Sequence, residues 1–510
     1  MPQQESRVKK SLLNARVNLI FYFLTLVLSF FSRKIFLDTL GADFVGLTVT
    51  LQNLLGFLNL AELGIGSAIG YVLYKPLFDH DEGKINEIIS VFGYLYRWIG
   101  FIILGAGLVL ACFLPLIFPN TQFEIGIIFF AYFAFLASSL IGYFANYKQT
   151  LLGADQKNYV VTAYFQTANI VKVLIQIASA YYTGSYYLWA SIELIFGIIY
   201  SIILNWKIKQ VYPWLRSEVR LGKQLFKKYP EVMKYTKQLF VHKMGGFIQW
   251  QTTPFLIYAF VSLQTVAYYG NYTIIVDKIN SFISNFLDST GAGVGSLIAE
   301  GNRDKEYRVF WELLAIRFFV SGAVMFSIFM LIEPFISLWL GFEYVLPRMV
   351  LIIILINFFL NLTRGATDQF IYGHGLFYDT WSPIVESSIY IIVAIIGGHF
   401  LGLKGVLLGA TVSLTLVIGC WKPYFLFTKG FKMPVVKYWI GWSKYILLIS
   451  LSGVLTYYLV SLIPLTLPYK NWLSWIVYAV VTTFSIIIVE LTFLLLFTQG
   501  MRDFVRRIIK

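Results

Sequence analysis

The chain has 510 residues, of which 58% are hydrophobic and only 13% are charged, and its formal net charge is +14. Soluble domains contain about 25% charged residues, so the composition excludes an ordinary water-soluble protein and indicates a membrane protein. The two cysteines, Cys112 and Cys420, and the four histidines are scattered. This spacing fits neither a disulfide framework nor a metal site, and we expect no cofactor.

Apolar runs long enough to cross a bilayer follow one another along the whole chain. A spanning helix needs about 20 mainly apolar residues, and by that rule the sequence predicts fourteen spans. Their approximate centres are at residues 25, 56, 104, 135, 170, 196, 250, 278, 320, 356, 391, 415, 452 and 484. The first run ends in Ser32-Arg33-Lys34 without a small-residue cleavage site, so we interpret it as a retained helix.

Lysine and arginine are unevenly distributed between the predicted loops. With the N-terminus inside, the inside segments hold thirty of the 40 basic residues, whereas the outside loops hold five and the spans hold five. Cytoplasmic loops carry an excess of Lys and Arg, so both termini are predicted to be cytoplasmic. Attraction of these loops to anionic headgroups explains the net charge, and we expect no nucleic-acid partner.

Two short strings recur six spans apart. Gly64 to Ile69 resembles Gly293 to Ile298, and Gln149 to Gly153 resembles Gln369 to Gly373. Six helices return the chain to the same side of the membrane, so the matches predict parallel repeats. The glycines follow no strand, which excludes a dinucleotide-binding motif and leaves helix packing or a flexible helix end.

The predicted fold is therefore an all-α polytopic membrane protein with two parallel six-helix lobes around a central cleft and two added C-terminal helices. The most basic loop lies between spans six and seven, and we take it as the boundary between the lobes. The predicted parts are an N-lobe, a basic cytoplasmic linker, a C-lobe, and a final pair of spans with a cytoplasmic tail, at 1–206, 207–236, 237–428 and 429–510.

Polar residues recur at helical spacing in spans one, two, seven and eight, which are mates in the repeat. A helix that faces only lipid has no reason to carry such a stripe, so the stripes predict a cavity or a helix contact. In-span charges cost about 2.5 to 3.5 kcal/mol at mid-bilayer and so mark candidate functional positions. Lys278 is the principal candidate, whereas Lys243 and Arg317 lie near the start of their spans and are expected to snorkel.

Several segments carry a resemblance to a known family. They are Phe36 to Gly41 with Val45 to Leu47, Leu60 to Ser67 in span two, and Gln149 to Asp155 after span four. Together with the six-plus-six-plus-two arrangement, they resemble the multidrug and oligosaccharidyl-lipid/polysaccharide flippase superfamily. The chain looks most like its polysaccharide-transporter branch, the Wzx-type flippases of O-antigen and capsule repeat units.

The resemblance implies a transporter in the bacterial inner membrane that moves undecaprenyl-diphosphate-linked oligosaccharides from the cytoplasmic to the periplasmic leaflet by rocking of its lobes. Its partners would be the lipid-linked oligosaccharide, membrane lipids and the proteins of polysaccharide polymerisation and assembly. A diphosphate requires cations, for which helix position favours Lys278, Lys243 and Arg97. Sugars require polar and aromatic partners, for which it favours Asn18, Gln52, Asn59, Gln249, Trp250 and Asn285. A coupling proton or cation would bind Glu62, Asp277 and Asp288, which alternatively neutralise nearby lysines.

Two other functions stay open on the sequence alone. A drug or cation antiporter of the same superfamily would have similar lobes and would bind Na⁺ or H⁺ at in-span acids. Typical drug antiporters have twelve spans, so the extra pair favours the lipid-linked substrate. A membrane enzyme acting on lipid-linked sugars would need a sizeable outside loop with catalytic residues. The sequence predicts no such loop, and we expect no enzyme.

Overall fold

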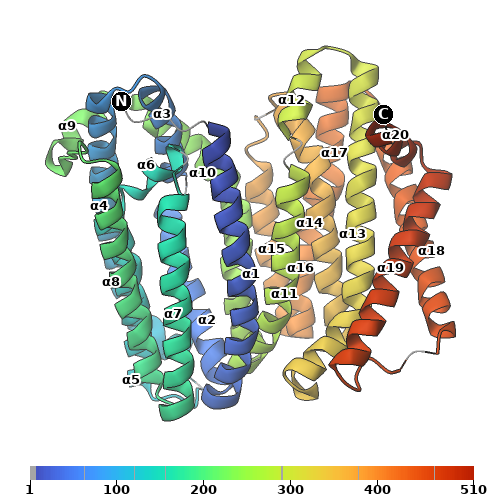
Figure 1. The fold of residues 1–510 in the computed structure, drawn as a ribbon, viewed down its shortest axis with the longest axis horizontal. Coiled ribbons are helices and arrows are strands. Elements are labelled where there is room, and N and C mark those ends of the chain that lie inside the picture. Colours follow the sequence, from blue (N-terminus) through green and yellow to red (C-terminus); the bar gives the residue numbers. More distant parts are fainter. Residues whose placement is uncertain are drawn as a thin grey trace. The chain divides into compact units, whose positions relative to one another are not determined.

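A computed structural model of the chain describes residues 7–62, 64–119, 121–155, 157–288, 291–376, 378–464 and 466–509. Within these ranges every regular element is a helix (Figure 1). Eleven of the described helices are long and apolar enough to cross a membrane. They contain eleven of the fourteen predicted span centres, and the other three fall in helices that are shorter or more polar, α2, α10 and α11. The predicted all-α polytopic fold is confirmed.

The chain divides into two compact units, Met1–Ala267 (unit 1) and Tyr268–Lys510 (unit 2). In chain order, the described elements of unit 1 are α1 (Arg7–Leu40), α2 (Ala42–Leu58), η1 (Asn59–Glu62), α3 (Ile65–Phe78), α4 (Glu82–Ile117), α5 (Ile125–Ala145), α6 (Gln149–Ala154), α7 (Tyr159–Thr183), α8 (Tyr186–Val211), η2 (Val219–Leu221), α9 (Gly222–Phe226) and α10 (Pro230–Phe260).

Helix α11 (Leu263–Asp288) begins in unit 1 and continues into unit 2. The elements that follow in unit 2 are α12 (Gly291–Ala299), α13 (Arg303–Trp339), η3 (Phe342–Tyr344), α14 (Arg348–Gly373), α15 (Ser382–Leu401), α16 (Leu403–Ser413), η4 (Leu414–Trp421), α17 (Lys422–Phe425), η5 (Leu426–Phe431), α18 (Val436–Leu462), α19 (Trp472–Phe497) and α20 (Gln499–Ile509). The π-helical stretches η4 and η5 interrupt the span that starts with α16.

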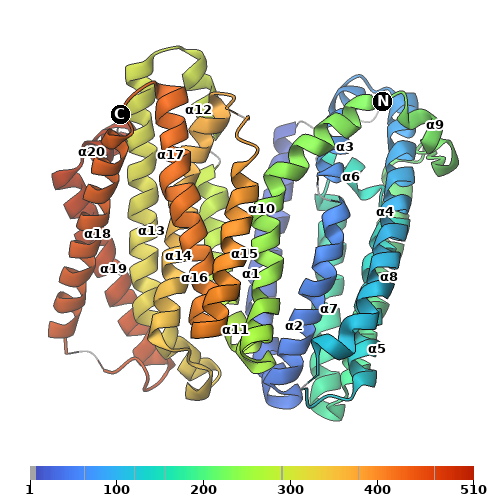
Figure 2. The same cartoon turned by 180° about the vertical axis from the view of Figure 1, so that it is seen from behind.

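The hydrophobic core of unit 1 runs along α2 to α5 and is closed by α8, because the apolar stripes of these helices face one another. Helix α10 also packs in unit 1, against α2 and α3, as Figure 2 shows. The sequence assigns this helix to the second lobe. Packing therefore divides the chain 31 residues after the predicted linker ends at 236, and the lobe boundaries given above stay a prediction.

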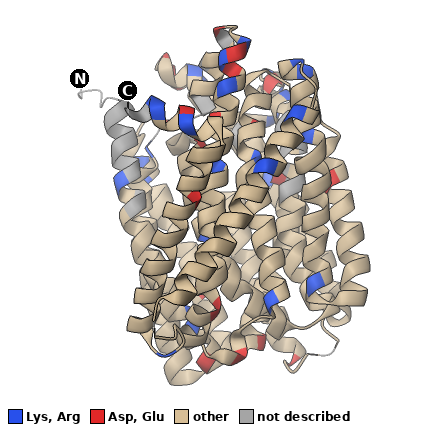
Figure 3. Cartoon of the chain, turned by 90° about the vertical axis from the view of Figure 1, so that its right-hand side faces the viewer, with Lys and Arg blue, Asp and Glu red and all other residues tan. Residues whose placement is uncertain are grey.

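In unit 2, α13 contacts α14, α18, α19 and α20 and is the central helix of the packing. Its core residues Phe310, Leu314 and Phe318 are fully buried among aromatic side chains from the neighbouring helices. Charged residues lie mostly toward the ends of the helices, and the helix middles are largely uncharged (Figure 3). The few charges that do lie within spans are therefore the positions to examine for function.

Candidate functional site

Span two is not a continuous helix. It is divided into α2, the short η1 and α3, and α3 is preceded by Gly64, whose φ of +95° lies in the left-handed region. A residue with a Cβ is disfavoured there by about 1 to 2 kcal/mol, so this glycine permits the break. Broken helices at membrane depth are tolerated where they are buried in protein or line a polar site. The break therefore identifies the segment around Asn59 and Glu62 as a candidate polar site.

Glu62 is the centre of a polar cluster at this break. Its carboxylate accepts hydrogen bonds from the hydroxyl of Tyr96 on α4 and from the hydroxyl of Tyr143 on α5, the latter at 2.7 Å. The Tyr143 hydroxyl also lies 2.8 Å from Oδ1 of Asn59. Both tyrosines are buried. An acid of η1 is thus held by neutral donors from two other spans.

Helix α11 is described as far as Asp288. This acid follows Glu62 by 226 residues, close to the offsets of the two repeated strings. Each half of the chain therefore has an acid close to one of the repeated glycine strings. In-span acids are candidate functional positions.

Asp288 pairs with a buried arginine. Nη2 of Arg317, on α13, lies 2.7 Å from Oδ1 of Asp288, and Nη1 donates to the carbonyl of Leu362 on α14 at 3.1 Å. A Cβ at Gly365 would overlap this guanidinium. The glycine therefore lets Arg317 lie directly on the backbone of α14.

A second arginine, Arg364, lies on the same cavity. Its Nε donates to Oδ2 of Asp368 at 2.9 Å, and Nη1 is 3.9 Å from Oε1 of Glu386 on α15. The cavity has a volume of about 620 Å³. Its charged and amide lining comes from α11, α13 and α14 and consists of Asp288, Arg317, Asn361, Arg364, Asp368 and Gln369. This arrangement provides paired charges and amide groups around a space large enough for a small polar group.

The predicted polar face of α11 leads toward this cavity. Lys278, Ser281, Asn285 and Asp288 are all exposed and follow one another at steps of three, four and three residues. The neighbouring Phe282 and Phe286 are exposed as well, whereas Asp277 is half-buried. Asn271, which the sequence puts in the same stripe, is fully buried. Of the predicted set, α11 thus presents Lys278, Asn285 and Asp288 on one accessible face.

The other predicted residues belong to unit 1. On α2, Gln52 is exposed, and on α10 Gln249 is half-buried and Trp250 is 61% exposed. Arg97 is exposed on α4 and belongs to neither polar cluster. The side chains of Asn18 and Lys243 lie outside the described part of the structure.

The expected snorkelling of Arg317 is wrong. Its side chain is 3% exposed and is held by Asp288 and the Leu362 carbonyl, because α14 covers the position that α13 alone would leave open. Another in-span pair has the structural role that the sequence left open for such charges. Lys172 lies 2.8 Å from Glu193, linking α7 to α8.

Sequence patterns did not single out three residues that make polar or close helix contacts in unit 1. Tyr96 and Tyr143 belong to an abundant residue type that interface belts explain, so nothing marked them as donors to Glu62. Gln251 on α10 also went unnoticed, although its amide lies against Gly56 of α2, where a Cβ would overlap it. The small residue Gly56 was a usable signal for this close helix contact.

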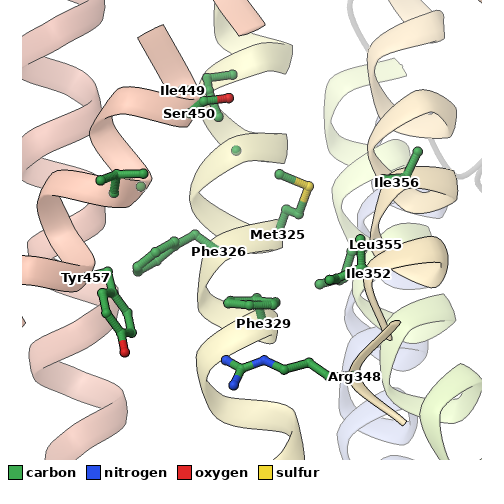
Figure 4. Close-up of a pocket in the computed structure, with 13 residues that line it drawn as sticks. Met325, Phe326, Phe329, Arg348, Ile352, Leu355, Ile356, Ile449, Ser450 and Tyr457 are labelled. Carbon is green, nitrogen blue, oxygen red and sulfur yellow. The ribbon is translucent and has the colours of Figure 1, made fainter. Parts of the chain in front are cut away.

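A second cavity in unit 2, of about 580 Å³, has a different character. It lies between α13, α14 and α18 and is lined mainly by apolar side chains. Figure 4 shows Arg348 at one end beside Phe329, whose ring centroid is 4.6 Å from the guanidinium carbon. Tyr457 of α18 lies on the opposite side. The apolar lining offers few partners to a polar or charged ligand, so the polar cavity is the better candidate site for one.

Comparison with known proteins finds similarity in structure alone. Neither the protein-family models nor the curated proteins give a match. A lipid II flippase MurJ in an inward closed conformation is 16% identical, covers 96% of this chain and 99% of its own, and superposes with a TM-score of 0.65. An inward-facing multidrug resistance MATE transporter is 14% identical over 79% of this chain and 94% of its own, with a TM-score of 0.60. The chain therefore has the fold that these two proteins share.

Proposed function

We propose that the protein is a flippase that moves undecaprenyl-diphosphate-linked oligosaccharide repeat units across the bacterial inner membrane by alternating access. The observation that carries this proposal is the exposed polar face of α11, with Lys278, Ser281 and Asn285 leading to Asp288 at the cavity. Lipid does not stabilise such a face, so it must border a water-filled path. A lysine followed by amide and hydroxyl groups fits a diphosphate followed by sugars.

The exposed aromatic residues on α11 fit the same substrate. Phe282 and Phe286 lie beside the polar stripe, and aromatic faces provide apolar contact area for a sugar ring. The lipid-flippase fold also covers 96% of the chain, including the final helix pair, whereas the MATE fold covers 79%. Both features favour a lipid-linked substrate over a free small molecule.

Glu62 is the proposed coupling acid of unit 1. It is bound by two neutral hydroxyl donors, and no described Lys or Arg side chain forms an ion pair with it that would compete with a proton or a cation. Asp277, half-buried on α11, is the second proposed coupling residue. In contrast, Asp288 is paired with Arg317, and we assign it to the substrate cavity.

A drug or cation antiporter is the second candidate, and one observation favours it. The cavity cluster combines the two guanidinium groups of Arg317 and Arg364 with three carboxylates, those of Asp288, Asp368 and Glu386. With every group ionised, acids outnumber bases. Such a cluster attracts a cation more than an anion.

The test is deletion of the gene in its native bacterium and complementation with wild type, Lys278→Ala or Lys404→Ala. Lys404 is an exposed lysine at the start of α16 and serves as the matched control. We expect deletion to trap diphosphate-linked glycan on the cytoplasmic leaflet, and Lys278→Ala to restore surface glycan far less than Lys404→Ala at equal membrane levels. Unchanged surface glycan with reduced tolerance to drugs or cations would instead identify an antiporter.

A further inference from the structure

The last helix pair contains an acid for which the proposed function has no role. One face of α19 is buried at every fourth residue, Thr482, Ile486, Glu490 and Leu494. The opposite face, with Phe484, Ile488 and Leu496, is exposed. Glu490 therefore points into the protein, and its exposed fraction is 0%.

Neither carboxyl oxygen of Glu490 has a hydrogen-bond partner among the described residues. The carboxyl lies directly against α13, because a Cβ at Gly322 would overlap Oε1. Ile449 of α18 contacts the same glycine, at 2.9 Å from that Cβ position. The acid is thus enclosed by backbone and aliphatic groups from two neighbouring helices.

No described charged side chain forms an ion pair with Glu490. The two ionisable residues of α13 nearest to Gly322 in sequence are already engaged, Arg317 with Asp288 and Glu312 with Arg507. The remaining ionisable groups of the helices that pack on α19 are Arg303, Asp304, Lys305, Glu306, Tyr307, Arg308 and Glu333 on α13, Lys437, Tyr438, Lys444, Tyr445, Tyr457 and Tyr458 on α18, and Arg502, Asp503 and Arg506 on α20.

A buried polar group without a partner requires an explanation, and an isolated carboxylate in an apolar surrounding is far more costly than the neutral acid. Acids within spans also mark functional positions by default. We propose that Glu490 is a proton-binding site of the α13–α19 interface, separate from the polar cavity and from Glu62. With its proton the acid fits the closed interface, whereas release of the proton requires α19 to move away from Gly322 or water to enter.

A carbodiimide tests this assignment on the full-length protein in membranes. The protonated carboxyl adds to N,N′-dicyclohexylcarbodiimide: the carboxyl oxygen bonds to the central carbon of the reagent, and the carboxyl proton passes to a nitrogen. The adduct then rearranges to an N-acylurea, which retains every atom of the reagent. Gly322 and Ile449 also line the second, apolar cavity of unit 2, which Figure 4 shows. This lipid-soluble reagent can therefore approach Glu490 closely. The readout is the mass of the peptide that contains Glu490, with exposed Glu343 as the control carboxyl.

We expect the reagent to label Glu490 at neutral pH and not to label Glu343. The signal should be lost in Glu490→Gln, and Na⁺ or K⁺ should not protect Glu490 from labelling. Protection by either metal ion would overturn the assignment in favour of a metal-cation site. Infrared spectroscopy covers the case in which the reagent does not enter, because a protonated carboxyl has a C=O band that Glu490→Gln removes. Absence of both the label and the band difference would overturn the proposal.

Discussion

The clusters around Glu62 and Asp288 lie at positions that the predicted repeat pairs, but the two acids bind different donors. In unit 1 the acid is held by the hydroxyls of Tyr96 and Tyr143. In unit 2 it is held by Arg317, which follows Tyr96 by 221 residues, and Arg364 lies the same distance after Tyr143. By these offsets, the positions that the predicted repeat pairs on spans three and nine, and on spans four and ten, carry phenols in one half and guanidinium groups in the other.

This difference shows how one repeat can supply two chemistries. A carboxylate held by phenols keeps its charge available to a proton or a cation, whereas a carboxylate held by a buried arginine is already neutralised and fixes that arginine in place. In each half, the neighbouring helices decide what the acid binds.

The largest expected effect comes from breaking the arginine pair of unit 2. Because Arg317 is almost fully buried and Asp288 is 57% exposed, removing the aspartate leaves a buried guanidinium with only a carbonyl partner. We expect Asp288→Ala to destabilise the protein by about 3 kcal/mol, measured by thermal unfolding in detergent. Adding Arg317→Met to Asp288→Ala should recover part of this loss. Equal stability of Asp288→Ala and wild type would show that the pair does not hold α11 to α13.

A smaller effect is expected from the phenols of unit 1. Tyr143→Phe removes a hydrogen bond to a charged group and should cost about 2 kcal/mol. Tyr132→Phe, on the same helix, removes a hydrogen bond to the neutral carbonyl of Gly107 and should cost about 1 kcal/mol. Only Tyr143→Phe should also change the dependence of transport on pH or on cations. The same change in both variants would remove the proposed coupling role of Glu62.

The smallest expected effect separates the two glycine strings. Gly64→Ala places a Cβ at a φ of +95° and should cost about 1 kcal/mol. At Gly66 an added Cβ makes an ordinary contact of 3.5 Å with the Tyr96 hydroxyl, and at Gly293 it meets nothing within 4 Å, so Gly66→Ala and Gly293→Ala should leave the unfolding temperature nearly unchanged. A larger loss for Gly293→Ala than for Gly64→Ala would contradict the assignment of the strained backbone position to Gly64.

Much of the fold could be predicted because hydropathy reports directly on which segments leave water. All fourteen span centres fall in helices, and the repeated glycine strings lie at the start of α3 and within α12. The π-helical stretches η4 and η5 and the inward face of α19 were not predicted. Periodicity describes one helix at a time, and these features depend on the helices packed against it.

The site was less predictable for the same reason. The spacing of Asn361, Arg364 and Asp368 puts them on one face of α14, but spacing cannot show that Arg317 of another helix reaches the same cavity. Charged residues within spans are rare, so the sequence alone identifies them as candidate functional positions. Tyrosines are common in this chain, and only the contact with Glu62 distinguishes Tyr96 and Tyr143 from the others.

Transport by the purified protein in liposomes tests the central claim most directly. Wild-type protein should move a polyprenyl-diphosphate oligosaccharide between the leaflets, measured by its accessibility to a membrane-impermeant sugar-modifying enzyme, and Lys278→Ala should slow this movement while Lys404→Ala does not. Exchange of a cationic drug for Na⁺ or H⁺, with no movement of the lipid-linked oligosaccharide, would contradict the account.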